Sequence, residues 1–285
     1  MAVEVEPQAT DQTAASGRHR RAARRRGASR LTWWHEVLLI AVGYAIYTVI
    51  RNTVPRHGHR ALANAVDIER WEKDLGIFHE HGLNNWFAAH HDIAVVGNYW
   101  YATAHFIVTI GVAVWVLWKH QRYARRLRIA WYSTNVVALF GFYFYPLAPP
   151  RMMPGFVDTV VTFGLWGSWG KKESPDGASN PYAAMPSMHI GWSVWCMLVV
   201  VVLARHWWIK ALAIAYPIIT VVVIAGTGNH YYLDAVGGLI ALGLGFIIAR
   251  LISGAWPFTP EPGPETGPEP AQRSGQTVGS APRPV

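Results

Sequence analysis

Two histidines, an aspartate and an arginine lie in short polar segments at the edges of long apolar stretches. His230 and Asp234 are four residues apart in the segment Gly226-Thr-Gly-Asn-His-Tyr-Tyr-Leu-Asp. If a helix begins near His230, this spacing puts both side chains on one face, one turn apart. A carboxylate there accepts the imidazole N–H, fixes the tautomer and leaves the other ring nitrogen free to attack an electrophile. The pattern indicates a nucleophilic histidine, although a His–Asp pair that merely caps the helix has the same spacing.

A second histidine follows a helix-start pattern in Met185-Pro-Ser-Met-His-Ile-Gly-Trp. Pro186 and Ser187 are typical of a helix start, where the serine caps free backbone N–H groups. These N–H groups and the positive end of the helix attract an anion, so His189 lies where a phosphate would bind. Taken alone, a histidine at a membrane boundary is equally explained as an interfacial anchor.

The arginine closes a proline-rich segment, Tyr145-Pro-Leu-Ala-Pro-Pro-Arg. Arg151 is held by the stiff chain before it, and its planar guanidinium matches the oxygens of a phosphate better than a lysine does. The alternative is an ordinary arginine at the end of a membrane span.

The chain that must position these residues has the composition of a membrane protein. Its 285 residues are 52% hydrophobic and 15% charged, and they include 15 Trp and 12 Tyr. The apolar residues form long blocks almost free of charge, which predicts transmembrane helices. We therefore expect an all-α, six-span membrane bundle, with spans at about Trp33–Ile50, Ile93–Trp118, Ile129–Pro150, Ile190–Ala204, Ala211–Gly228 and Ala235–Ala249.

Basic residues set the expected orientation and the domain limits. Seven arginines precede the first span, and five basic residues occupy Lys119–Arg128. The positive-inside rule then places both termini in the cytoplasm and the three polar segments on the extracytoplasmic face of the cell membrane. Residues 1–30 and 254–285 are expected to be disordered tails around a catalytic domain at residues 31–253. The basic N-terminal tail is better explained by attraction to anionic lipids than by nucleic-acid binding.

Together, Pro-Pro-Arg151, Pro-Ser-x-His189 and His230-x-x-x-Asp234 resemble the three-part signature of the type 2 phosphatidic acid phosphatase superfamily. The resemblance covers roughly Leu31 to Ser253. It implies a six-helix core and metal-independent, cofactor-free catalysis through a phosphohistidine. It also implies that His230 is the nucleophile, Asp234 its orienting carboxylate and His189 the general acid, while Arg151 and Ser187 bind the phosphate of a lipid substrate.

The sequence departs from that signature at positions that usually carry cations or glycine. Phe144 replaces a lysine, Val223 and Ile224 replace Ser-Arg, and Met188 replaces a glycine. Lys171, Lys172, Asn229 and backbone N–H groups would have to compensate at the phosphate. Pro-Ser-x-His-x-Gly-Trp, Asn-His-Tyr-x-x-Asp and the stretch Glu69–Glu80 are instead similar to the inositol phosphorylceramide synthase branch, in which an alcohol accepts the phosphoryl group.

Two other functions are compatible with parts of this sequence. A transporter or scaffold would use the same residues to bind a lipid headgroup without turnover. A metal site is suggested by the histidines of the first outer segment, but pairs of histidines without thiols or a clear carboxylate set are a weak metal signal. These histidines are His57, His59, His79, His81, His90 and His91.

Overall fold

The protein is all-helical in the part that the computed structural model describes. The described residues are 58–164 and 180–262, with short stretches between residues 38 and 50. They contain no β-strand, and one isolated bridge joins Leu147 and Ala183. The principal helices are α3 (Gly58–Asp74), α4 (Glu80–Ala89), α5 (His91–Tyr99), α6 (His105–Lys119), α7 (Gln121–Phe144), α8 (Thr159–Phe163), α10 (Met188–Leu203), α11 (Trp207–Gly226) and α12 (Tyr232–Ser253).

Three helical stretches of the described chain are long and apolar enough to cross a membrane. They are His91–Lys119, with 29 residues, α11 with 20 and α12 with 22. At 1.5 Å per residue, about 20 residues cross the roughly 30 Å of hydrocarbon. These helices indicate a membrane protein. Helix α10 is a shorter apolar helix of 16 residues, and half of the expected first span lies outside the described residues, so the six-span bundle stays a prediction.

The expected third span differs from the helix that forms there. The sequence predicted a span at Ile129–Pro150 after an inner loop, but α7 begins at Gln121 and ends at Phe144. Its first turns therefore contain most of the basic residues assigned to that loop, and His120 alone separates α6 from α7. Arginine has a high helix propensity, so a charged segment continues the helix. At the other end, the prolines after Tyr145 stop it.

Helix α12 packs against α7 and α10 through glycines. A Cβ atom on Gly238 would lie 2.3 Å from the carbonyl oxygen of Ser187 in the turn before α10. A Cβ atom on Gly245 would lie 2.2 Å from Oγ1 of Thr134 on α7. Small residues of this kind let membrane helices approach until their backbones touch. The position of α12 is therefore fixed by backbone contact.

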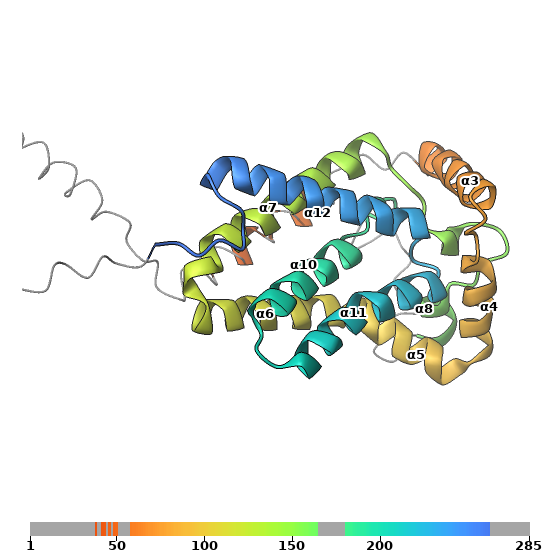
Figure 1. Cartoon of the computed structure of the whole chain (residues 1–285). Coiled ribbons are helices and arrows are strands. Elements are labelled where there is room, and N and C mark those ends of the chain that lie inside the picture. Colours follow the sequence, from red (N-terminus) through yellow and green to blue (C-terminus); the bar gives the residue numbers. More distant parts are fainter. Residues whose placement is uncertain are drawn as a thin grey trace, which may run out of the picture.

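Helices α3 and α4 lie across one end of the bundle, while the start of α7 and the end of α12 lie at the other (Figure 1). The buried face of α3 consists of Ala61, Ala65 and Ile68, all 0% exposed. This face packs near Leu147 and Tyr231, which belong to the segments after α7 and before α12. The two polar helices thus contact the segments that carry the chemistry identified above.

The first residues beyond α12 contact the start of α7 and the end of α12 itself. The carbonyl oxygen of Glu261 accepts a hydrogen bond of 2.8 Å from Nε of Arg122. The Glu261 carboxylate also forms an ion pair with Arg125, and Phe258 packs against Phe246 at 5.6 Å between ring centroids. Residues after Pro262 lie outside the described part.

Candidate active site

His230 and Asp234 are in contact, but by a different geometry from the one we expected. Helix α12 begins at Tyr232, so His230 precedes it and does not share a helical face with Asp234. Asp234 folds back as part of a capping box, in which its Oδ2 accepts the N–H of Tyr231 at 3.0 Å. The same oxygen lies 3.1 Å from Nδ1 of His230. A carboxylate that contacts Nδ1 favours the tautomer with its proton there and leaves Nε2 as a lone-pair donor.

His189 faces the free nitrogen of His230. Nδ1 of His189 and Nε2 of His230 are 3.2 Å apart, and His189 is the second residue of α10. If Asp234 accepts the His230 proton at Nδ1, then Nε2 must accept in this contact and His189 must donate. In that tautomer, Nε2 of His230 carries a lone pair and Nδ1 of His189 carries the proton of this contact.

Arg151 reaches the same place from the end of α7 through a single 3₁₀ turn, Pro150–Met152. Its backbone N–H donates to the carbonyl of Gly228 at 2.7 Å, and Gly228 has a φ of +71°, which glycine adopts without strain. Its side chain donates to Oδ1 of Asn229 and lies 3.4 Å from a carboxylate oxygen of Asp158. The guanidinium is thus held beside His230 by two side chains, and the Asp158 contact was not evident from the sequence.

Ser187 and Asp234 lie behind the site. The Ser187 side chain is fully buried and does not line the cavity, although the sequence predicted that it would bind phosphate. Its backbone N–H donates to the carbonyl oxygen of Asp234 at 2.9 Å. This hydrogen bond connects the start of α10 to the start of α12. It therefore fixes the position of His189 relative to His230.

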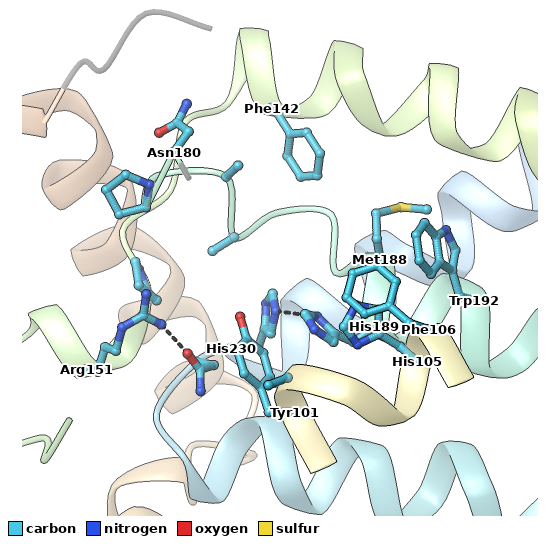
Figure 2. Close-up of a pocket in the computed structure, with 16 residues that line it drawn as sticks. Tyr101, His105, Phe106, Phe142, Arg151, Asn180, Met188, His189, Trp192 and His230 are labelled. Atoms are coloured by element: carbon cyan, nitrogen blue, oxygen red, sulfur yellow. Dashed lines mark hydrogen bonds between the residues drawn. The ribbon is translucent and has the colours of Figure 1, made fainter. Parts of the chain in front are cut away.

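A cavity of about 240 Å³ opens in front of these groups. His189, His230, Arg151 and Asn229 all line it, and Figure 2 shows His230 between Arg151 and His189 in that view. His230 itself is 5% exposed, which shields its ring from bulk water. Within the described residues, Arg151 is the only permanently charged side chain on the cavity wall. The site therefore suits an anionic group that presents oxygens to one guanidinium and an electrophilic centre to His230.

Two further aromatic side chains enter the site, one from a π-helical turn that the hydropathy pattern did not reveal and one from the start of α6. Trp100–Ala104 forms a π-helix between α5 and α6, and such turns are frequent at functional sites. Tyr101 stacks on His189 with ring centroids 4.4 Å apart. His105 meets His189 edge to face, also at 4.4 Å. The His189 ring is thus held between two aromatic rings.

Ile224, one of the positions that depart from the family signature, supports the site through its backbone rather than its side chain. The carbonyl oxygen of Ile224 accepts the N–H groups of Asn229 and His230, at 2.9 and 3.1 Å. This places the turn before α12 without a side-chain cation. Phe144 is 62% exposed on the outside of α7, away from the cavity. Lys171 and Lys172 lie outside the described residues.

The ranges that the structure describes, 58–164 and 180–262, contain no cluster of side chains that could bind a metal ion. No group of three or more His, Cys, Asp or Glu side chains there is placed to hold a metal ion. His57, one of the six histidines considered for such a site, lies outside these ranges.

Comparison with known proteins gives one match. A family model described as PAP2 superfamily matches residues 66–248, which is more than half of the 285 residues. The matched range contains all three polar segments. No curated protein and no solved structure matches the chain.

Proposed function

Because the chain belongs to the PAP2 superfamily, we propose that it transfers a phosphoryl group from a membrane lipid phosphate through a phosphohistidine on His230. Membership supports phosphoryl transfer of the lipid phosphatase type. The nucleophile rests on one observation, the chain of contacts from Asp234 to Nδ1 of His230 and from Nε2 to His189.

In the first half-reaction, Nε2 of His230 attacks the phosphorus and the bond from phosphorus to the leaving oxygen breaks. His189, as an imidazolium, donates one proton to that oxygen, so the alcohol leaves neutral and His189 becomes a neutral imidazole. The imidazolium formed at His230 is stabilised by Asp234, which is 0% exposed. Arg151 lies where it would stabilise charge on the transferring oxygens. The phosphate would replace the direct contact between the two imidazoles.

In the second half-reaction, a hydroxyl group attacks the phosphohistidine from the side that the leaving group vacated. Neutral His189 takes the proton of that hydroxyl, and the N–P bond breaks with its electron pair returning to His230. An imidazole suits both roles because its ordinary pKa lies near neutral pH.

A second cavity supports a substrate with a hydrocarbon chain. It has a volume of about 400 Å³ and extends along α6, α7 and α10. Phe106 and Trp192 line both this cavity and the candidate active site. Almost all of its other lining residues are apolar, so it suits the tail of a lipid whose headgroup occupies the first cavity.

The distribution of basic residues supports a site on the extracytoplasmic face of the cell membrane, with both termini inside. Lys119, Arg122 and Arg125 lie where α6 ends and α7 begins. The cavity lies at the other ends of these helices, where α6, α10 and α12 begin (Figure 1). The positive-inside rule assigns the basic end to the cytoplasm.

An acceptor assay tests the reaction and its class. Purified protein is incubated with phosphatidic acid, a prenyl phosphate or phosphatidylinositol, with and without ceramide. We expect turnover of at least one donor. Free phosphate identifies a phosphatase, whereas a new phosphodiester lipid identifies a transferase like the inositol phosphorylceramide synthase branch. Absence of both products from all three donors would contradict the proposed function.

Chelation tests the proposed metal independence. Both groups that make and break bonds in this scheme are imidazoles, so we expect activity within about twofold of the untreated protein after dialysis against EDTA. The measurement is the initial rate on the best donor from the acceptor assay. A loss that added Mg²⁺ or Zn²⁺ restores would contradict this part of the proposal.

A further inference from the structure

Two buried glutamates lie outside the cavity, on the helices that cover the end of the bundle. Glu72 and Glu80 are both 0% exposed. Glu72 continues the buried face of α3, four residues after Ile68, where helical spacing calls for an apolar side chain. Glu80 is the first residue of α4. Fully buried glutamates are rare unless they have a partner, so this pair requires an explanation.

Both glutamates bind the first turn of α12. Oε1 of Glu80 accepts the N–H of Tyr232 at 2.9 Å, and Oε1 of Glu72 accepts the N–H of Leu233 at 2.7 Å. Asp234 accepts the N–H of Tyr231. The three consecutive N–H groups between His230 and Asp234 are therefore each held by a carboxyl group. A helix leaves its first N–H groups without internal partners, and here distant helices supply them.

The two glutamates are also close to each other, and their protonation states are linked. Burial, and then a hydrogen bond to Glu80, raise the pKa of Glu72 from 4.5 to about 9. Oε2 of Glu72 and Oε2 of Glu80 have no hydrogen-bond donor among the described residues. A single proton shared by the two carboxyl groups lets one of these oxygens donate a hydrogen bond to the other glutamate. The raised pKa of Glu72 favours one proton shared by the two carboxyl groups at neutral pH. The other titratable groups that face this pair are Asp234 on α12, and Tyr231 and Tyr232 before and at the start of α12.

We propose that Glu72 and Glu80 form a proton-sharing carboxyl pair that positions His230 and Asp234 by holding the start of α12. This inference rests on the proposed function of His230. The pair does not touch the cavity and acts through the backbone of residues 232 and 233. A shift of about 1 Å in a catalytic group lowers the rate about 100-fold, so the anchors of this turn affect turnover.

Two conservative variants of Glu72 distinguish the effect of its side-chain length from the effect of its acidic proton. In E72Q the side chain keeps its length and its acceptor oxygen, and the amide N–H₂ replaces the donor of the protonated carboxyl. In E72D the acid remains, but the side chain is one methylene shorter and withdraws from the N–H of Leu233. A positioning role predicts that E72Q keeps kcat within about threefold and that E72D loses roughly 100-fold in kcat with little change in KM.

The matched control is Glu69→Ala, one turn earlier on α3. Glu69 forms a partly exposed ion pair with Lys73, and neither residue lines the cavity. We expect E69A to keep wild-type kcat, because it removes a carboxylate of the same helix without touching α12.

Hydrogen–deuterium exchange gives a readout that does not depend on activity. In detergent micelles, we expect the amides of residues 232 and 233 to exchange at least tenfold faster in E72D than in the wild type. E72Q and E69A should exchange as the wild type does. This measurement still tests the anchor if wild-type protein turns over no lipid phosphate, which would count against the proposed function alone.

The pH profile provides the second independent readout. Glu72 is protonated below its raised pKa, so kcat of the wild type should fall as pH rises through about 9. Burial of the protonated form also means that the wild-type Tm falls as pH rises between 4.5 and about 9. The E72Q variant cannot ionise and should lose the Glu72 part of both changes. A fully active E72D, an inactive but folded E72Q, or unchanged exchange in E72D would each overturn the proposal.

Discussion

Replacement of His230 by alanine should lower turnover of every lipid phosphate donor by roughly 10⁴-fold or more, the size of effect seen when a covalent nucleophile is removed. The reason is that no other side chain replaces its Nε2. Asp234 contacts Nδ1 of His230 and so places a carboxylate behind its Nε2, whereas the neighbouring His189 presents its own Nδ1 to that Nε2. The measurement is kcat/KM in micelles, together with acid-quench detection of a labelled phosphoenzyme that should be absent from H230A.

Loss of the imidazole leaves Asp234 buried without that partner, so folding needs its own control. H230Q keeps an amide N–H that can reach Asp234 and should be equally inactive with a smaller loss of Tm. His206→Ala, at an exposed residue before α11 on the far end of the bundle, should be fully active. If H230A or H230Q still turns over lipid phosphates, His230 is not the nucleophile. If the wild type binds them without turnover, the transporter or scaffold hypothesis is favoured.

Replacement of His189 by alanine should separate the two halves of the reaction. A general acid–base contributes about 10²- to 10⁴-fold, so H189A should lose that much on an alkyl phosphate lipid. An aryl phosphate has a leaving group that needs little protonation, so its first step should be much less affected. The second step still lacks its base, and labelled phosphoenzyme should therefore accumulate in a rapid-quench experiment with H189A but not with the wild type.

Removal of His189 also removes the ring that Tyr101 and His105 enclose, so H189Q serves as a second variant. If H189A and H189Q slow the alkyl and aryl phosphates equally, and no phosphoenzyme accumulates, His189 does not transfer the proton. The two substrates should be compared at saturation, since a change in KM alone would report altered binding of the headgroup.

The apolar part of the fold was the most accessible from the sequence. The blocks at Ala211–Gly228 and Ala235–Ala249 lie within α11 and α12 apart from one end that is off by two residues, because long apolar runs leave few alternatives to a membrane helix. Helix α7 begins eight residues before the span predicted at Ile129–Pro150, because arginines, which a hydropathy pattern treats as loop residues, continue a helix well. The superfamily was also predicted correctly from the three motifs, whereas its branch stays a prediction.

The candidate site was only partly accessible. The contact between His230 and Asp234 was expected from their spacing, but the helix starts later, and the contact depends on a capping box. The π-helical turn that presents Tyr101 has no signal in an apolar run of the second span. The sequence singled out the stretch Glu69–Glu80 only by its resemblance to a family branch and predicted no burial of Glu72 or Glu80. Their burial depends on how α3 and α4 pack on α12, which is a long-range contact that no local pattern specifies.

The glycine contacts of α12 determine which wall of the cavity can move. Gly238 and Gly245 bring its backbone against the turn before α10 and against α7, so a sliding or rotating α12 would collide at once. The wall that carries His230 is therefore rigid. Elsewhere on the cavity wall, Tyr101 and Ala102 belong to the π-helical turn Trp100–Ala104, and His105 is the first residue of α6. A bulky headgroup would therefore have to be admitted by movement of residues outside α12, while Nε2 of His230 stays in place.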